Sequence, residues 1–267
     1  MHYIYPCQHN ADADYLVLSS GLGGHASFWN PQIQVLSHYF HVLAYDQEGC
    51  HADSGLLPDD YSFKNLAEQI LKILKDQRIQ NFHFIGHAIG SFIGAELAVL
   101  CVSQHLNMLS LTCINAWDRL DPHTLKCFEA RIHLLKSVNA EAYVRAQALF
   151  LYPPAWISKY YLKIHDAENL QLLDFPPVHN VLGRIRVAQK FAISARHQHA
   201  LKDIPMHLIA NQDDFLVPVQ KTRDLKKGFG HANVSIHSQG GHASTVTEAN
   251  IMNTILLDFL VKQQTLV

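Results

Sequence analysis

The chain has 267 residues, enough for one large α/β domain or two small ones, and a chain of this length buries roughly three quarters of the surface that its unfolded form exposes. Its 21 Lys and Arg residues nearly balance its 23 Asp and Glu residues, which removes the electrostatic case for a nucleic-acid partner or an anionic membrane surface. The expected partner is therefore a small molecule, with no nucleic acid and no membrane.

In the first half of the chain, short apolar runs alternate with stretches of helical character. We predict strands at residues 15–19, 41–45, 81–85 and 109–115, and helices at 28–36, 61–76 and 91–98. Parallel neighbouring strands need crossover helices between them. The alternation therefore predicts an α/β fold with a mainly parallel twisted sheet and helices on both faces.

The alternation stops between residues 117 and 196, where helical segments are interrupted by Pro153-Pro154 and Pro176-Pro177. Strands return at residues 206–210 and 233–236, and a C-terminal helix is expected at about 247–262. We therefore predict one core, built from residues 1–116 and 197–267, with a helical cap inserted at 117–196. A cap at the carboxyl edge of the sheet excludes water and shapes a pocket.

Cysteine usage and the lack of long apolar segments favour the cytoplasm. The five cysteines are odd in number, widely spaced and contain no C-x-x-C pair, which argues against a disulfide framework or a zinc ribbon. The N-terminal residues lack the basic and apolar regions of a signal peptide, and no later stretch is long enough to span a bilayer.

The sequence Gly86-His87-Ala88-Ile89-Gly90 lies between the predicted strand at 81–85 and the helix at 91–98. A strand, a sharp turn and a helix, with glycines on both sides of the central residue, form the nucleophile elbow of the α/β-hydrolases. That pattern has Ser, Cys or Asp at its centre, whereas this chain has Ala88. The sequence thus predicts the α/β-hydrolase fold and a nucleophile elbow that lacks its nucleophile.

Two later loops supply the other members of a hydrolase triad, in the chain order of that fold. Asp214 lies four residues before Pro218 in the loop after the strand at 206–210 and is predicted to be the acid, with Asp213 as the alternative. His242 follows two glycines after the last strand and is the predicted catalytic histidine. The acid would hold the imidazole Nδ1 so that Nε2 faces the pocket as a base.

The oxyanion hole is expected to use two backbone N–H groups. One belongs to Ile89, directly after the elbow centre, and the other to Leu22 in the glycine-rich loop after the first predicted strand. The glycines of this loop also fit a simple tight turn. His87, beside the elbow centre, is interpreted as a packing residue.

We expect no cofactor and no metal. The loop at residues 20–24 has neither the P-loop pattern nor a complete dinucleotide-binding fingerprint. The chain contains no H-E-x-x-H motif and no compact Cys/His cluster, and His197 and His199 lie two apart without a third partner.

Several segments of the core and the cap together carry a family likeness: Ser20–Gly24, Tyr45–Gln47, Gly86–Gly90, Pro122–Thr124, Cys127-Phe128, Ala148–Pro153 and Gly240–Ala243. They resemble the RutD family (pyrimidine utilisation protein D), and the likeness covers nearly the whole chain, cap included. It implies an α/β-hydrolase of bacterial uracil breakdown that speeds hydrolysis of carbamate or of 3-aminoacrylate, small intermediates that also decay unaided. The elbow of that family also holds alanine in some members, so Ala88 need not be an engineered change. Glu48 departs from the wider superfamily, in which this turn commonly has Arg.

Labile substrates of this kind fit a site without a nucleophile. In a serine hydrolase, losing the nucleophile removes about a millionfold of rate, yet roughly 10³ to 10⁴ over water remains from the rest of the site. Both implied substrates need proton transfers, which general acid/base catalysis provides. We therefore predict that His242, held by Asp214, protonates the substrate or deprotonates water, while the N–H groups of Ile89 and Leu22 hold the developing oxyanion.

Three other functions remain open from the sequence. Ser20, Ser91 or Cys50 could act as a displaced nucleophile in ordinary acyl transfer. The chain could be a non-catalytic binding protein that keeps the pocket as a relic, since decay also leaves alanine at an elbow. The same His and Asp could serve cofactor-free proton-transfer or lyase chemistry. A homodimer is compatible with the sequence, which does not fix the oligomeric state.

Overall fold

A seven-stranded sheet, ordered β1-β3-β2-β4-β5-β6-β7, forms the centre of the fold. The computed structural model describes residues 1–264. Within them every neighbouring pair of strands is parallel except β1 with β3, which confirms the predicted mainly parallel sheet. The strands are His2–Tyr5 (β1), Tyr15–Ser19 (β2), His41–Tyr45 (β3), Asn81–His87 (β4), Asn107–Ile114 (β5), Met206–Asn211 (β6) and Asn233–His237 (β7).

The edge strand β1 was not predicted from the sequence. It pairs antiparallel with β3, with His2 opposite Tyr45 and Tyr5 opposite Val42. A strand of this length receives its backbone hydrogen bonds from its neighbour, so its formation depends on tertiary pairing more than on a local pattern.

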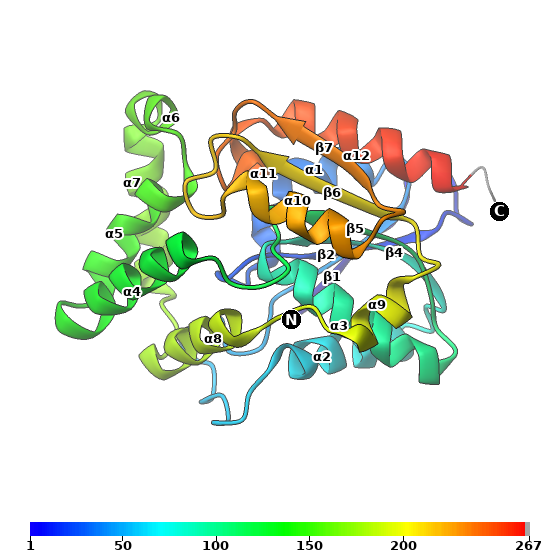
Figure 1. The fold of residues 1–267 in the computed structure, drawn as a ribbon, viewed down its shortest axis with the longest axis horizontal. Helices are drawn as coiled ribbons and strands as arrows, with labels where there is room; N and C mark the ends of the chain where they lie inside the picture. The colour runs from blue at the N-terminus through cyan, green and yellow to red at the C-terminus, as the bar shows by residue number, and fades with distance from the viewer. Residues whose placement is uncertain (265–267) are drawn as a thin grey trace.

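Helices cover both faces of the sheet (Figure 1). One face carries α1, α11 and α12, and the other carries α2, α3, α9 and α10. The helices of the two faces are Asn30–Leu36 (α1), Phe63–Asp76 (α2), Ile89–Gln104 (α3), Ala195–Leu201 (α9), Val219–Gly228 (α10), Ser244–Thr247 (α11) and Ala249–Gln264 (α12), and a 3-10 turn, Ala26–Trp29 (η1), precedes α1.

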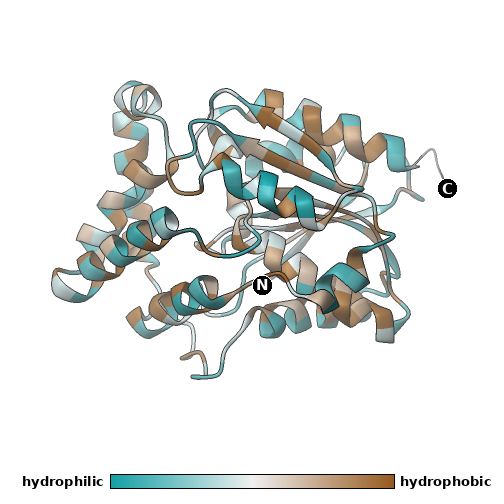
Figure 2. Cartoon of the chain, in the orientation of Figure 1, coloured by the Kyte–Doolittle hydropathy of each residue, from teal (hydrophilic) through white to brown (hydrophobic). Residues whose placement is uncertain are grey.

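Successive residues of each inner strand pack into different cores. In β2, Leu16 and Leu18 pack toward α1 and α12, whereas Val17 packs toward α2 and α3. Side chains alternate between the two faces of a strand, and both faces are covered here. The inner strands are therefore mostly apolar, as the brown stretches along them in Figure 2 show, while teal residues lie on the outer sides of the helices. Polar residues of these strands, such as His83, Ser110 and Thr112, are buried.

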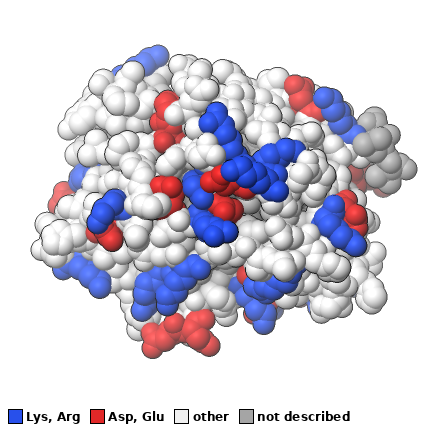
Figure 3. Space-filling model, in the orientation of Figure 1, with Lys and Arg blue, Asp and Glu red and all other residues white. Residues whose placement is uncertain are grey.

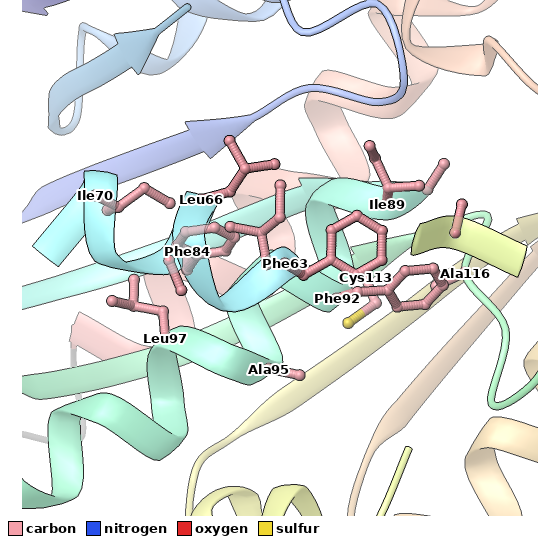
Figure 4. Close-up of a cluster of buried hydrophobic side chains, with 14 of the residues drawn as sticks. Phe63, Leu66, Ile70, Phe84, Ile89, Phe92, Ala95, Leu97, Cys113 and Ala116 are labelled. Carbon is pink, nitrogen blue, oxygen red and sulfur yellow. The ribbon is translucent and has the colours of Figure 1, made fainter. Parts of the chain in front are cut away.

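The core under α2 and α3 is rich in aromatic rings (Figure 4). Phe63 of α2 lies 5.7 Å from Phe92 of α3 between ring centroids, and Phe84 of β4 is fully buried in the same cluster. Burying one such side chain stabilises the fold by about 1.5–3 kcal/mol. This packing anchors α3, whose first turn contributes to the candidate site.

A group of helices stands beyond one end of the sheet, at the left of Figure 1. They interrupt the core between β5 and β6, and the double prolines separate them as predicted, since α5 ends at Leu151 and α8 begins at Val178. An isolated β-bridge joins Arg119 and Ala192, where the chain leaves and rejoins the core. The helices are Pro122–Ser137 (α4), Ala140–Leu151 (α5), Pro154–Lys159 (α6), Tyr161–Leu173 (α7) and Val178–Lys190 (α8).

Charged side chains of both signs are interspersed on the face seen in Figure 3. No helix within residues 1–264 combines the length and the apolar character needed to cross a bilayer. Within the same residues all five cysteines are free thiols.

Candidate active site

The turn between β4 and α3 has the backbone geometry of a nucleophile elbow. Ala88, at its apex, has φ of 49°, a left-handed value that an L-residue adopts only at a cost of about 1–3 kcal/mol. A Cβ added to Gly86 would lie 2.3 Å from the nitrogen of Ser91, and one added to Gly90 would lie 2.2 Å from the carbonyl oxygen of Ser19. Both glycines are therefore required by the close approach of strand and helix.

The apex offers a methyl group where hydrolases of this fold carry a nucleophile. Ala88 is buried, and its N–H donates to the carbonyl oxygen of Ile114 at 2.8 Å, which ties the turn to β5. Ile89 is the first residue of α3, so its N–H belongs to the N-terminal amides that lack an intrahelical acceptor. The predicted oxyanion donor is thus at a helix N-terminus, where the helix dipole favours negative charge.

The structure brings the predicted acid and histidine together. The Nδ1 atom of His242 lies 2.8 Å from Oδ2 of Asp214, and the two side chains are only 3% and 1% exposed. The second carboxylate oxygen of Asp214 accepts hydrogen bonds from the N–H groups of Leu216 and Val217 at 2.8 and 2.9 Å. With Nδ1 donating to the carboxylate, Nε2 of the neutral imidazole is free to act as a base.

Asp213, the alternative acid, has a different role in the structure. Its carboxylate accepts hydrogen bonds from the N–H groups of Gly240 and Gly241 at 3.1 and 2.9 Å. These glycines have φ of 129° and 65°, so the turn before His242 adopts a backbone that favours glycine. Asp213 therefore holds the histidine loop, and Asp214 contacts the imidazole.

Two asparagines that the sequence analysis did not single out also hold this loop. The side-chain amide of Asn115, after β5, donates to the carbonyl oxygen of His242 at 2.6 Å. That of Asn211, at the end of β6, donates to the carbonyl oxygen of Gly241 at 3.0 Å. In the sequence, both could have been found as polar side chains at the carboxyl end of a buried strand, which is where ligands of such sheets bind.

His87 packs against the catalytic candidate, in line with its interpretation as a packing residue. Its ring lies 4.9 Å from that of His242 and 4.8 Å from that of Phe28 between centroids, and its Nε2–H donates to the carbonyl oxygen of His242 at 2.8 Å. Burial, followed by the nearby His242, lowers the pKa of His87 to about 3. His87 is therefore neutral at physiological pH.

The loop that carries Leu22 packs against the elbow. A Cβ on Gly21 would lie 2.9 Å from Nδ1 of His87, and the N–H of Gly24 closes the turn on the carbonyl oxygen of Gly21 at 3.1 Å. The Gln47 amide donates to the carbonyl oxygen of Ser20 at 2.7 Å. Leu22 is thus held in a short turn next to the strand that ends at the elbow.

A residue of α8 also reaches this region. The Arg184 guanidinium, from α8, donates to the side-chain oxygen of Gln47 and, at 3.1 Å, to the carbonyl oxygen of Glu48. A guanidinium is therefore present beside the turn even though the turn itself has Glu48 in place of the arginine common in the superfamily.

Residues of α4 and α5 also touch the loops of the acid and the histidine. The Thr124 hydroxyl of α4 donates to the carbonyl oxygen of Leu216 at 2.8 Å. The N–H of Ala243 donates to the carbonyl oxygen of Leu151, at the end of α5, at 3.0 Å. Helices α4 and α5 therefore help to fix both loops that meet at the His242–Asp214 pair.

The fold and the order of these loops place the chain among the α/β-hydrolases. A family model described as alpha/beta hydrolase fold matches residues 15–132. The solved structure of the enol-lactonase from Burkholderia xenovorans LB400 is similar, with a TM-score of 0.83 over 98% of this chain and 96% of that chain, at 20% sequence identity. At this identity the likeness shows the fold alone.

Sequence relatives narrow the class further. A protein of Acinetobacter baylyi named "Putative carbamate hydrolase RutD" is 52% identical over 249 residues, which cover 93% of this chain and 94% of that protein. A protein of the same name from Stutzerimonas stutzeri is 40% identical over 263 residues, 98% of this chain and 97% of that protein. The chain belongs to the RutD family of α/β-hydrolases.

Proposed function

We propose that this protein is a cytoplasmic hydrolase of uracil breakdown that promotes cleavage of the C–N bond of carbamate or of 3-aminoacrylate, with His242 as the general acid and base and Asp214 as its partner. The observation that carries the proposal is a buried imidazole–carboxylate pair, 2.8 Å apart, in a site whose elbow apex is Ala88. The name of the relatives supports carbamate as the first substrate to test. Residues 117–196 would form the cap that encloses the substrate.

Carbamate cleavage needs one proton on nitrogen. His242, once protonated, would donate its Nε2 proton to the carbamate nitrogen, and the C–N electron pair would leave with that nitrogen as ammonia. The remaining carbon dioxide takes up water to give bicarbonate and a proton, which restores the proton that the imidazole gave up. Positioned proton transfer of this kind contributes typically 10² to 10⁴ in rate.

3-Aminoacrylate needs a proton on carbon and then water. Protonation of the carbon next to the carboxylate converts the enamine into an iminium ion. The imidazole, now neutral, would take a proton from the water that attacks the iminium carbon and return it to the nitrogen, which leaves as ammonia with the C–N electron pair. The hydroxyl left on that carbon would then give its proton to the imidazole and become the carbonyl of an aldehyde. The same His242 thus acts first as an acid and then as a base, which requires the carboxylate of Asp214 to stabilise its protonated form.

The N–H groups of Ile89 and Leu22 would stabilise negative charge on substrate oxygen. One preorganised oxyanion donor contributes on the order of 3 kcal/mol in acyl-transfer enzymes. The first turn of α3 supports this role for Ile89, because the unpaired N–H groups and the helix dipole act in the same direction.

The side chains considered as displaced nucleophiles have surroundings that disfavour attack. The Ser91 hydroxyl donates to the carbonyl oxygen of Gly86 at 2.8 Å. Burial raises the pKa of the Cys50 thiol to about 11, so Cys50 is a protonated thiol at neutral pH. The thiolate is the nucleophilic form of cysteine, and the thiol is a much poorer nucleophile. The Ser20 hydroxyl is buried and has no hydrogen-bond partner within the described residues, so no base activates it.

Ammonia release from freshly generated carbamate and 3-aminoacrylate, followed with and without the protein, tests the proposal. We expect the protein to accelerate release from at least one of the two substrates by about 10² or more. Equal rates with and without protein for both substrates would instead identify a non-catalytic relic.

A further inference from the structure

Four side chains with metal-binding atoms, none of them part of the His242–Asp214 pair, come together near the loop that carries Leu22. They are His25, from the loop after β2, and Asp46, Cys50 and His51, from the loop after β3. One ligand atom of each lies within 4.8 Å of the ligand atoms of all the others. The sequence analysis did not predict this cluster, because the two loops are brought together only by the pairing of β2 with β3.

We propose that His25, Asp46, Cys50 and His51 form a binding site for a thiophilic divalent cation of the Zn²⁺ type. Two imidazoles, one thiolate and one carboxylate are a donor set that Zn²⁺ takes in tetrahedral geometry. Their combined formal charge of about −2, with the thiol deprotonated by the cation, would neutralise the ion.

The distances fit a preformed site that contracts slightly around an ion. Zinc bonds of about 2.0–2.3 Å imply separations of roughly 3.3–3.8 Å between ligand atoms in a tetrahedron. Nε2 of His51 lies 3.4 Å from Oδ2 of Asp46, and Sγ of Cys50 lies 4.0 Å from Nδ1 of His25. The required shifts are therefore within reach of small side-chain rotations.

Groups around the cluster already orient the ligands. Nδ1 of His51 lies 2.7 Å from Oδ2 of Asp174, which leaves Nε2 of His51 directed to the cluster. This carboxylate–histidine arrangement fixes the tautomer and raises the basicity of metal-binding histidines. The N–H of Ala26 donates to Oδ1 of Asp46 at 2.9 Å, and the Tyr3 hydroxyl donates to Oδ2 at 3.1 Å. Oδ2, which also lies nearest Nε2 of His51, keeps a second lone pair for a cation.

Burial gives the site an inner and an outer side. Cys50 and Asp46 are buried, whereas His25 and His51 are half-buried. A cation could therefore enter past the imidazoles and bind the thiolate and the carboxylate in the interior, where ion pairing is less screened.

A cation here would connect three parts of the chain near the active-site region. His25 directly follows the turn that carries Leu22, and a Cβ on Gly24 would lie 2.7 Å from Cβ of Cys50. Asp174 follows α7 of the cap and also accepts from the N–H of Ala52 at 2.9 Å. We therefore expect the ion to stabilise the junction of the β2 loop, the β3 loop and the cap.

Titration of the full-length, chelator-treated protein with Co²⁺ and Zn²⁺ tests this inference. The unmodified protein should bind one Co²⁺ and show the thiolate-to-cobalt charge-transfer band and the intense visible bands of a tetrahedral site. One equivalent of Zn²⁺ should displace the cobalt and raise the thermal unfolding midpoint. Cys50→Ser should lose the charge-transfer band, and His25→Gln should lose the tetrahedral spectrum.

Cys127→Ser is the matched control. Cys127 is also buried and its Sγ lies 3.6 Å from Nε2 of His123, but it is outside the cluster, so this variant should keep the full spectrum. Asp174→Asn should weaken binding about 10- to 100-fold while keeping the spectrum at saturation, as expected for a residue that orients a ligand. Circular dichroism in chelator checks that each variant is folded.

Two results would overturn the inference. The first is the absence of a tetrahedral thiolate spectrum in the unmodified protein at saturating Co²⁺. The second is the same spectrum in the folded Cys50→Ser variant, which would place the metal at another cysteine of the chain. The ammonia-release assay is separate from this titration, so failure of either proposal leaves the other intact.

Discussion

The two carboxylate oxygens of Asp214 have different partners. Oδ1 accepts from two N–H groups of its own loop, those of Leu216 and Val217, and Oδ2 faces the imidazole of His242. The loop therefore fixes the direction of the carboxylate independently of the histidine. Such preorganisation lets the pair respond to substrate without reorienting.

Restoring a hydroxyl at the elbow apex tests whether the site still has the geometry of a serine hydrolase. We predict that Ala88→Ser makes the protein reactive with a fluorophosphonate probe, because the backbone at residue 88 already has the left-handed φ of 49° and His242 can activate the new hydroxyl. The unmodified protein should stay unlabelled, and so should the Ala88→Ser, His242→Ala double variant. Mass spectrometry of the intact chain measures the labelling.

A folded Ala88→Ser variant that fails to react would show that Nε2 of His242 does not face the apex. Labelling of the unmodified protein would instead support acyl transfer by a nucleophile outside the elbow apex. Peptide mapping would then identify the reactive residue.

At the residue scale, spacing was informative where the motif is local. The distance between Asp214 and Pro218 and the glycines before His242 were sufficient to select the pair that the structure brings together. Asn115 and Asn211 have no such local signature, because their importance arises only when β5 and β6 end beside the histidine loop. The proposed cation site could not be predicted from the sequence for the same reason, because its four residues meet only when β2 pairs with β3.

At the element scale, the elbow depends on how closely β4, α3 and β2 approach one another. We predict that Gly90→Ala destabilises the fold by about 1–3 kcal/mol or more, since its Cβ would lie 2.2 Å from the carbonyl oxygen of Ser19 and the backbone must move. Gly23→Ala is the matched control, because a Cβ there meets nothing within 4 Å, and its effect should stay within about 0.5–1 kcal/mol.

Urea unfolding, followed by circular dichroism, measures both changes. The variants are fitted with one common slope of the free energy of unfolding against urea concentration. Equal stability of Gly90→Ala and Gly23→Ala would mean that the elbow tolerates separation of its strand and helix, contrary to the packing described above.

Among the elements, the sequence was most informative where periodicity was strong. The helix predicted at 61–76 is α2, at Phe63–Asp76, and its buried face is apolar, with Phe63, Leu66, Ala67, Ile70, Ile73 and Leu74. The polar helix α10 was not predicted, because its packing side is limited to few residues, among them Thr222 and Leu225. Local pattern alone does not separate such a helix from a loop.

At the scale of the whole molecule, buried neutral histidines link stability to pH. Burial, followed by the charge of His237, lowers the pKa of His207 to about 4, and the pKa of His87 is about 3. The unfolded chain takes up these protons near pH 6.5, whereas the folded chain resists them. Stability is thus complete above about pH 6.5 and falls as the pH decreases toward 4.

We predict that His207→Gln reduces this pH dependence. In the unmodified protein each such histidine contributes a slope of up to about 1.4 kcal/mol per pH unit between about pH 6 and pH 4. As the pH is lowered, the free energy of unfolding of His207→Gln should decrease less steeply than that of the unmodified protein, with a slope smaller by up to about 1.4 kcal/mol per pH unit. His199→Gln, at an exposed position, should keep the original slope, and an unchanged or steeper slope for His207→Gln would contradict the assignment.

The central claim is that the imidazole of His242 performs the proton transfers in a site without a nucleophile. The most direct measurement is the protein-dependent rate of ammonia release from the substrate that it accelerates, compared between the unmodified protein, His242→Ala and the exposed-site control His199→Ala. We predict a loss of about 10² to 10⁴ in kcat for His242→Ala and no loss for His199→Ala. An unchanged kcat in a folded His242→Ala variant would contradict the account.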